Sequence, residues 1–484
     1  MHPPESAPTP GRASRRSVAA LTGWMLVVTC TGGVLGWQLS DDGVPADRAG
    51  ASVTTLDSGA SRGSDGRSGS AAGVSARGYL NGSAGPTEQW HLRAARTADR
   101  LAAAQDVVAR RAQALRDRDR AAFLATVDAQ DRRLRRSQAA QFDNLARVPV
   151  EDWQVEVSNE PEGMRLLPGG PADRFTLPVT VRHRLRGYDT GWAGRETVLT
   201  LVRRGPGWRV AAEGPAPTAR SHRPASSRPV PRDLWQLGHV GVLRTSRTLV
   251  LATAPRSVMP RVARETDAAV RRVARRWGQD WGRRVVVLVP RTVRGMASLL
   301  GTRPRQVRRI AAVTTSQVPG GPDGSADRVV VNPQAFAKLS GVGRRVVFTH
   351  EVTHVATRVA TTGRVPTWLA EGLADYVGYA GTGVPLDRAA AELLGDVRAG
   401  REPKRLPSRR DFDGTSRRLA QAYESAWMAC LMVVKDAGER TLFAFYRAVG
   451  RIGLPAATGR VLHTSPSRFT AHWRRFVREN AGRA

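Results

Sequence analysis

The chain has 484 residues, of which 41% are hydrophobic and 24% are charged. This length and mixture argue against a disulfide-stapled miniprotein, a wholly disordered chain and a protein with many membrane spans. Basic residues outnumber acidic ones 75 to 42, a formal net charge of +33 that favours contact with an anionic polymer or surface. Only Lys338, Lys404 and Lys435 are lysines, so a coding bias toward arginine explains the excess equally well.

The N-terminal part predicts a membrane segment. Residues 18–39 are 22 consecutive uncharged residues, enough for a transmembrane helix across a hydrocarbon core of about 30 Å. Three arginines in residues 1–17 precede this run and two aspartates follow it. We therefore expect a cytoplasmic basic tail at residues 1–17 and a single-pass cell-membrane anchor, with the C-terminal regions extracytoplasmic. The alternative is a signal peptide cleaved at Val44-Pro45-Ala46, followed by secretion.

Two further segments are predicted to be linkers. Residues 40–88 are rich in Gly, Ser, Asp and Ala, so they cannot bury enough surface to offset the entropy of ordering. Residues 215–232 combine Pro, Ser and Arg between two regions of globular composition. The two cysteines, Cys30 and Cys430, provide neither a disulfide framework nor a cysteine metal site.

Residues 89–214 predict a folded region of α+β class. Apolar residues recur at helical spacing in residues 101–115 and again in residues 123–127. Alternation of apolar and other side chains predicts the longest strand, and shorter apolar runs predict three more. The expected strands are residues 153–157, 175–185, 196–202 and 208–212. Helices followed by an antiparallel sheet resemble the NTF2-like fold, an α+β cone. His183 lies on the apolar side of its strand, so we expect a core position rather than a ligand site.

Residues 233–484 predict a second folded region, which begins with a strand, a helix and a strand. Strands are expected at residues 247–254, 285–289 and 329–331, and helices at residues 262–277 and 342–360. The second of these helices carries the strongest chemical signal of the chain.

That signal is the segment His350-Glu351-Val352-Thr353-His354. Because residues i and i+4 share one helix face, both imidazoles can bind a single ion, and the adjacent Glu351 can reach a water molecule on that ion. A catalytic zinc usually has three protein ligands and a water molecule, so a third ligand is needed. The spacing HExxHxxGxxH is excluded, since Thr357 and Ala360 occupy its last two defined positions.

The candidate for the third ligand is Glu371, seventeen residues after His354. Gly363 can end the first helix and Pro366 can begin the next, so a tight reversal would bring Glu371 back beside the two histidines. Its neighbours in the sequence are apolar, and an unpaired charge among them would be costly. Exposure of Glu371 to solvent is the alternative.

HEVTH followed by WLAEGLADY resembles the gluzincins, the thermolysin-like clan of zinc metallopeptidases, and in particular the peptidase-MA-like branch. The resemblance implies a zincin-type domain in which His350, His354 and Glu371 bind Zn²⁺ and Glu351 is the general base. It also implies that Asp375 orients a histidine ligand, although an acid on the helix surface is an equal alternative.

The resemblance also implies a mechanism. Zinc-activated water attacks the peptide bond, and Glu351 passes its proton to the leaving amine. An oxyanion donor is required as well, for which Tyr423 is the first candidate and Tyr376 and His463 are others; a structural role is the alternative for each. The strand at residues 329–332 takes the place of the family's edge strand, which pairs with substrate through its backbone.

Two functional hypotheses follow. The first is a membrane-anchored, extracytoplasmic zinc metallopeptidase that acts on a peptide or protein substrate. The alternative is a catalytically inactive zincin-like protein whose basic surface binds an anionic polymer or cell wall. Neither hypothesis includes a specific nucleic acid.

Overall fold

The computed structural model describes residues 86–158, 165–166, 173–214, 229–316 and 326–483. Helices and antiparallel and mixed sheets make up this part of the chain, which confirms the α+β class. The predicted cytoplasmic tail and anchor, and nearly all of both linkers, lie outside the described residues. Within the described part, no helix is both long enough and apolar enough to cross a membrane.

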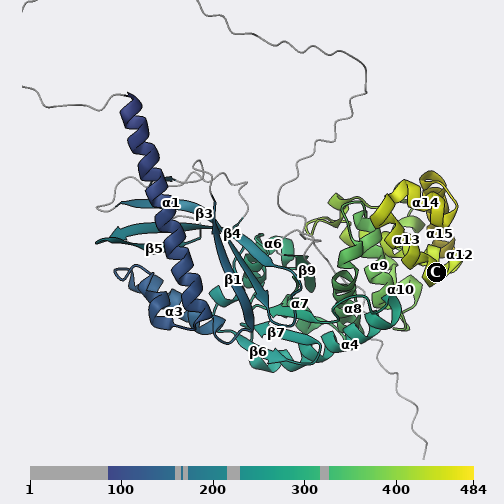
Figure 1. The fold of residues 1–484 in the computed structure, drawn as a ribbon. Coiled ribbons are helices and arrows are strands. Elements are labelled where there is room, and N and C mark those ends of the chain that lie inside the picture. Colours follow the sequence, from purple (N-terminus) through teal and green to yellow (C-terminus); the bar gives the residue numbers. More distant parts are fainter. Residues whose placement is uncertain (1–85, 159–164, 167–172, 215–228, 317–325, 484) are drawn as a thin grey trace, which may run out of the picture. The chain divides into compact units, whose positions relative to one another are not determined.

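The first folded region consists of three helices followed by an antiparallel sheet (Figure 1). Its helices are α1 (Pro86–Arg116), α2 (Arg120–Ala125) and α3 (Arg132–Leu145). Its strands are β1 (Val150–Val157), β2 (Arg165–Leu166), β3 (Arg174–Leu185), β4 (Ala193–Arg204) and β5 (Gly207–Glu213). The strand order is β1-β3-β4-β5, with β2 paired to β3. The four predicted strands lie within β1, β3, β4 and β5.

Helix α3 was not predicted. Its buried face includes two glutamines, Gln138 and Gln141, so the apolar periodicity is weak. The expectation for His183 is confirmed, because the side chain is buried in β3. Its ring stacks on Trp153 at a centroid distance of 5.9 Å and meets Trp235 edge-on at 5.0 Å.

The second folded region is built on a mixed sheet with the strand order β6-β7-β8-β10-β9. These strands are β6 (Gly241–Arg244), β7 (Thr248–Ala252), β8 (Val285–Val289), β9 (Ala312–Ser316) and β10 (Asp327–Val331). Strand β8 is parallel to β7 and β10, whereas β6 and β9 are antiparallel to their single neighbours.

The position predicted for the edge strand was wrong. Residues 329–331 belong to β10, which lies between β8 and β9, and β9 is the edge of the sheet as far as the described residues show it. Every residue of β10 is buried, as expected for an interior strand whose two faces are both covered. The edge strand β9 was not predicted, because its five residues end in Thr314, Thr315 and Ser316 and show no apolar run.

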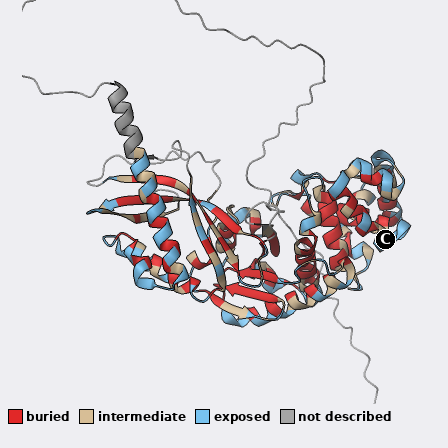
Figure 2. Ribbon diagram, in the orientation of Figure 1, coloured by how far each residue is buried: buried red, intermediate tan, exposed pale blue. Residues whose placement is uncertain are grey.

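Helices make up most of the rest of this region. The long ones are α4 (Met259–Trp277), α8 (Gly341–Thr357), α9 (Thr367–Tyr379), α12 (Leu419–Ala437), α13 (Glu439–Ile452), α14 (Leu454–Leu462) and α15 (Pro466–Arg483). The shorter ones are α5 (Val293–Leu299), α6 (Pro304–Val307), α7 (Pro333–Lys338), α10 (Leu386–Ala389) and α11 (Ala391–Arg398), and a 3₁₀ turn, η4 (Arg358–Ala360), continues α8. Buried residues run along the strands and the C-terminal helices (Figure 2).

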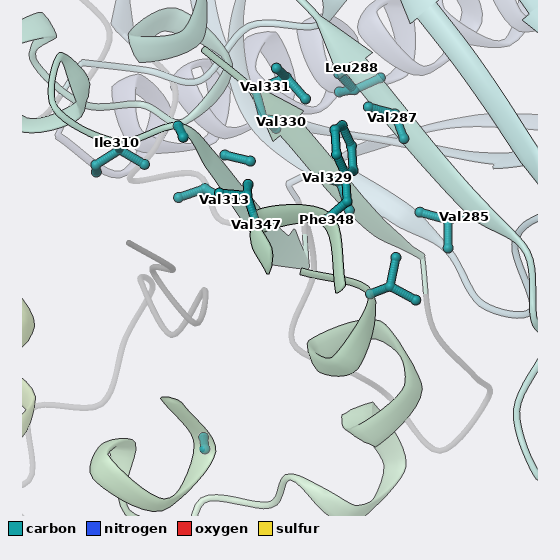
Figure 3. Close-up of a cluster of buried hydrophobic side chains, with 14 of the residues drawn as sticks. Val285, Val287, Leu288, Ile310, Val313, Val329, Val330, Val331, Val347 and Phe348 are labelled. Atoms are coloured by element: carbon teal, nitrogen blue, oxygen red, sulfur yellow. The ribbon is translucent and has the colours of Figure 1, made fainter. Parts of the chain in front are cut away.

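Helix α8 packs directly against the sheet. Val347 and Phe348 of α8 belong to the same hydrophobic cluster as Val313 of β9 and Val329 of β10 (Figure 3). This packing fixes the helix that carries His350 beside the edge strand.

The two folded regions share one hydrophobic cluster and several buried polar contacts. Asp189, in the turn after β3, accepts two hydrogen bonds of 2.6 and 2.7 Å from the guanidinium of Arg328 on β10. Both side chains are 2% exposed. Asn144 of α3 donates to the carbonyls of Trp235 and Gly238 and accepts from the amide of Val240. Residues on either side of the predicted linker 215–232 therefore form one continuous core.

Candidate metal centre

Two helices carry pairs of polar residues that face each other. Helix α8 carries His350 and His354, and α9 carries Glu371 and Asp375. Within each pair the residues are four apart, so they lie on the same side of their helix. All four polar side chains are buried, and most of the residues around them on both helices are apolar.

The ligand atoms of three of these residues form a small triangle. Nε2 of His350 lies 3.0 Å from Nε2 of His354, and Oε2 of Glu371 lies 3.3 Å and 3.5 Å from these two nitrogens. Zinc binds nitrogen and oxygen at about 2.0–2.2 Å, which separates neighbouring ligands of a tetrahedral site by about 3.3–3.5 Å. The chemistry and spacing of this donor set therefore fit a tetrahedral divalent ion, and no other such cluster occurs among the described residues.

Asp375 contacts the ring nitrogen of His350 that does not belong to the triangle. Its Oδ1 lies 2.7 Å from Nδ1 of His350, on the opposite side of the ring from the triangle of donor atoms. A carboxylate at this position accepts the Nδ1 proton, which leaves the lone pair of Nε2 for a metal. Asp375 is therefore not a surface acid. Its contact with Nδ1 is the kind of contact that orients a histidine ligand.

Glu351 is completely buried and contacts the edge strand. The hydroxyl of Thr314 on β9 lies 2.6 Å from Oε2 of Glu351 and donates to it. The other carboxylate oxygen, Oε1, has no hydrogen-bond partner among the described residues. A buried carboxylate oxygen without a partner is costly, and a water molecule between Glu351 and a bound cation would satisfy it.

The pKa values of the two glutamates in the cluster are shifted in opposite directions. Burial opposes the charged form of Glu371, but His354 and His350 hold its pKa down to about 2. Burial raises the pKa of Glu351 to about 8, against the opposing effect of His350. Burial also opposes protonation of His350, but the carboxylate of Asp375 outweighs it and raises the pKa of His350 to about 10. These side chains thus combine an ionised ligand with a carboxyl group that exchanges protons near neutral pH.

Of the three candidate oxyanion donors, Tyr423 is the one whose ring lies near a histidine of the cluster. Its ring centroid lies 6.3 Å from that of His350, and Phe412 packs edge-on against it at 5.0 Å. The hydroxyl of Tyr376 is instead hydrogen-bonded to Glu439, where burial raises its pKa to about 12. His463 is exposed at the C-terminal end of α14.

Close helix packing at two glycines explains how α9 reaches α8. A Cβ on Gly372 would lie 2.2 Å from the carbonyl oxygen of Ala426 on α12, and one on Gly378 would lie 3.2 Å from that of Val346 on α8. These residues follow Glu371 and Asp375 by one and three positions. The glycines therefore allow α9 to lie between its two neighbours with its acidic side chains directed at the histidines.

Two residues near the cluster escaped the sequence analysis. Thr314 was missed because it lies in the unpredicted strand β9. Arg358, one helical turn beyond His354, forms an ion pair with buried Asp327 of β10 at 2.7 Å.

No known protein-family model matches the chain, and no curated protein sequence matches it. The functional argument therefore depends on the residues of the site.

Proposed function

We propose that the chain is a membrane-anchored, extracytoplasmic zinc metallopeptidase of gluzincin type. In this proposal residues 233–484 are a zincin-type domain, residues 89–214 an NTF2-like domain and residues 18–39 the anchor. The observation that carries the proposal is the triangle of Nε2, Nε2 and Oε2 atoms from His350, His354 and Glu371. A second observation supports the proposal: α8 carries a buried carboxylate, Glu351, next to His350 in the sequence.

Each residue of the site has a role in this proposal. Zinc, when bound, supplies a Lewis acid and lowers the pKa of a water molecule toward about 7. Glu351 takes a proton from the attacking water and returns it to the nitrogen of the leaving amine. Thr314 holds one oxygen of Glu351, so the other is directed at the water. Asp375 keeps the proton of His350 on Nδ1.

The edge strand supports a peptide as substrate. Among the strands that the structure describes, β9 pairs only with β10, and its Thr314 contacts the proposed base. An extended peptide that pairs with the outer edge of β9 would pass beside Glu351 with its amide groups held by backbone hydrogen bonds. This assigns to β9 the role that the sequence analysis gave to residues 329–332.

The test is the substitution Glu351→Gln in the 484-residue chain. It keeps the shape of the side chain and removes the base, so we expect cleavage of a peptide library to fall at least about 1,000-fold while zinc is retained. Glu479→Gln on α15, an exposed position, is the matched control. Cleavage that survives Glu351→Gln would overturn the mechanism.

The alternative is a catalytically inactive zincin-like protein whose basic surface binds an anionic polymer or cell wall. The observation that favours it is the net charge of +33. Such binding should be insensitive to Glu351→Gln and should weaken steeply as salt concentration rises. A zinc-loaded chain that cleaves no peptide but binds wall polymer in this way would support the alternative.

A further inference from the structure

A cavity of about 580 Å³ opens between α4, α13 and α14. None of its lining residues belongs to the candidate metal centre. Its volume lies within the range of about 300–1,000 Å³ that is typical of small-molecule sites.

Five arginines line this cavity: Arg276, Arg440, Arg447, Arg451 and Arg460. Three of them are on α13 and recur on one face of the helix, at positions seven and four residues apart. The small side chains of Ala444 and Ala448 lie on the same face and leave the space open between the guanidinium groups.

The positive charge of the cavity is only partly neutralised. Arg276 forms an ion pair with Glu439. No ion pair of Arg440, Arg451 or Arg460 occurs in the part of the chain that the structure describes, and all three are exposed. Burial lowers the pKa of Arg447, the carboxylate of Asp280 partly opposes this effect, and the neighbouring charge of Arg451 adds to it. An anion in the cavity would therefore relieve the remaining repulsion between Arg447 and Arg451.

The remaining lining is apolar. The guanidinium of Arg447 stacks on the indole of Trp277, with its Cζ 3.9 Å from the ring centroid, and donates to the carbonyl of Trp277 at 2.8 Å. Phe443 and Val461 lie beside it. Ile452 is 40% exposed, and it is one of only three large hydrophobic side chains that the described residues leave exposed.

We propose that this cavity binds an anionic phospholipid, with the phosphate held by the arginines and the first part of an acyl chain in contact with the apolar lining. Arginine presents planar, paired donors that suit phosphate oxygens. A free phosphate would leave the apolar lining wet, and a neutral lipid would leave the arginines unpaired. A nucleic-acid backbone needs an extended track of cations, whereas these cations surround a single cavity.

The test is a titration of the 484-residue chain in a nonionic detergent, read by native mass spectrometry. The probes are dioleoyl-phosphatidylglycerol, dioleoyl-phosphatidylcholine and sn-glycerol 3-phosphate. We expect phosphatidylglycerol to bind at least about 10-fold more tightly than either of the other two. The double substitution Arg451→Gln/Arg460→Gln should weaken its binding about 30-fold, since each arginine near an anionic lipid contributes a factor of about five.

Two further variants keep the result interpretable. Arg398→Gln/Arg468→Gln removes the same charge from exposed positions outside the cavity and should leave binding within about 3-fold of the wild type. Ala444→Trp fills the cavity from an exposed position of α13. It should weaken the binding of phosphatidylglycerol as strongly as the double arginine substitution does. The proposal is overturned if phosphatidylcholine or glycerol 3-phosphate binds as tightly as phosphatidylglycerol, or if both double variants lose affinity equally.

Discussion

The hydroxyl of Thr314 on β9 donates a hydrogen bond of 2.6 Å to Oε2 of Glu351 on α8. It joins the edge strand of the sheet to the carboxylate next to the first histidine of the candidate metal centre. In the proposed enzyme, one residue thereby connects the strand that receives the peptide with the group that moves the proton.

Replacing Thr314 with Val keeps the shape of the side chain and removes this donor. The hydroxyl stabilises the charged carboxylate, so its loss should raise the pKa of Glu351 and move the acidic limb of the kcat/KM profile to higher pH. We expect kcat/KM for a peptide substrate to fall about 10- to 100-fold, with metal content unchanged. Thr314→Ser should restore most of the activity. A Thr314→Val variant with the wild-type pH profile would show that the hydroxyl has no part in proton transfer.

Asp375→Asn should weaken metal binding without removing it. The neutral amide oxygen accepts the Nδ1–H hydrogen bond of His350 more weakly than a carboxylate does, so the ring is less basic and less firmly oriented, and we expect a loss of about 10- to 100-fold in zinc affinity. Competition with a chelator measures the change. Asp387→Asn, at an exposed position of α10, is the control and should bind zinc as the wild type does. Equal affinity of both variants would contradict the role assigned to Asp375.

Asp189→Ala should destabilise the chain strongly. It leaves the buried guanidinium of Arg328 without its two hydrogen bonds, and breaking one partner of a buried ion pair costs about 3–5 kcal/mol. The free energy of unfolding in urea measures this loss. Asp106→Ala removes an acid from the exposed pair with Arg110 and should cost less than about 1 kcal/mol. Similar losses in the two variants would mean that the contact between the folded regions contributes little.

His183 should make the folded state sensitive to acid. Burial lowers its pKa from an ordinary value of 6.5 to about 3, so between these values the unfolded chain binds a proton that the folded chain does not. This side chain therefore costs stability as pH falls, by up to about 1.4 kcal/mol per pH unit well below 6.5. His183→Gln should lose this dependence, so its stability relative to the wild type should improve from pH 7 to pH 4. A constant difference across that range would contradict the assignment.

Gly372→Ala should disturb the packing of α9 on α12. The added Cβ would lie 2.2 Å from the carbonyl oxygen of Ala426, and forced overpacking of this kind costs about 1–3 kcal/mol. Gly395→Ala on α11 meets no atom within 4 Å and should be neutral or stabilising, since alanine favours a helix. Thermal unfolding compares the two variants. An equally stable Gly372→Ala variant would show that α9 can move without loss.

Local patterns carried most of the predictions that the structure confirms. Alternation revealed β3, apolar residues on one helix face revealed α4, and the four-residue spacing of His350 and His354 predicted their common face. Features that depend on distant parts of the chain were missed. Nothing near Thr314 in the sequence indicates its contact with Glu351, 37 residues away. The resemblance to the gluzincins placed residues 329–332 at the edge of the sheet. This prediction was wrong, and the local sequence could not correct it, since strand order is set by long-range pairing that a run of valines does not encode.

The buried pair of Arg328 and Asp189 illustrates the same limit. In the sequence each is an ordinary charged residue, and they are separated by 139 positions. Only the packing of the two folded regions brings them together. The arginine-lined cavity was likewise hidden, because the excess of arginine throughout the chain masks the spacing of Arg440, Arg447 and Arg451 on one helix face.

The measurement that tests the central proposal most directly is the zinc content of the purified 484-residue chain, compared with His350→Ala, Glu371→Ala and His472→Ala, a control at a partly exposed histidine of α15. We predict one zinc ion per chain in the wild type and the control, and none in the other two variants, with all four folded by circular dichroism. A folded, zinc-supplied wild type without zinc, or zinc retained after both ligand substitutions, would contradict the proposed metal centre.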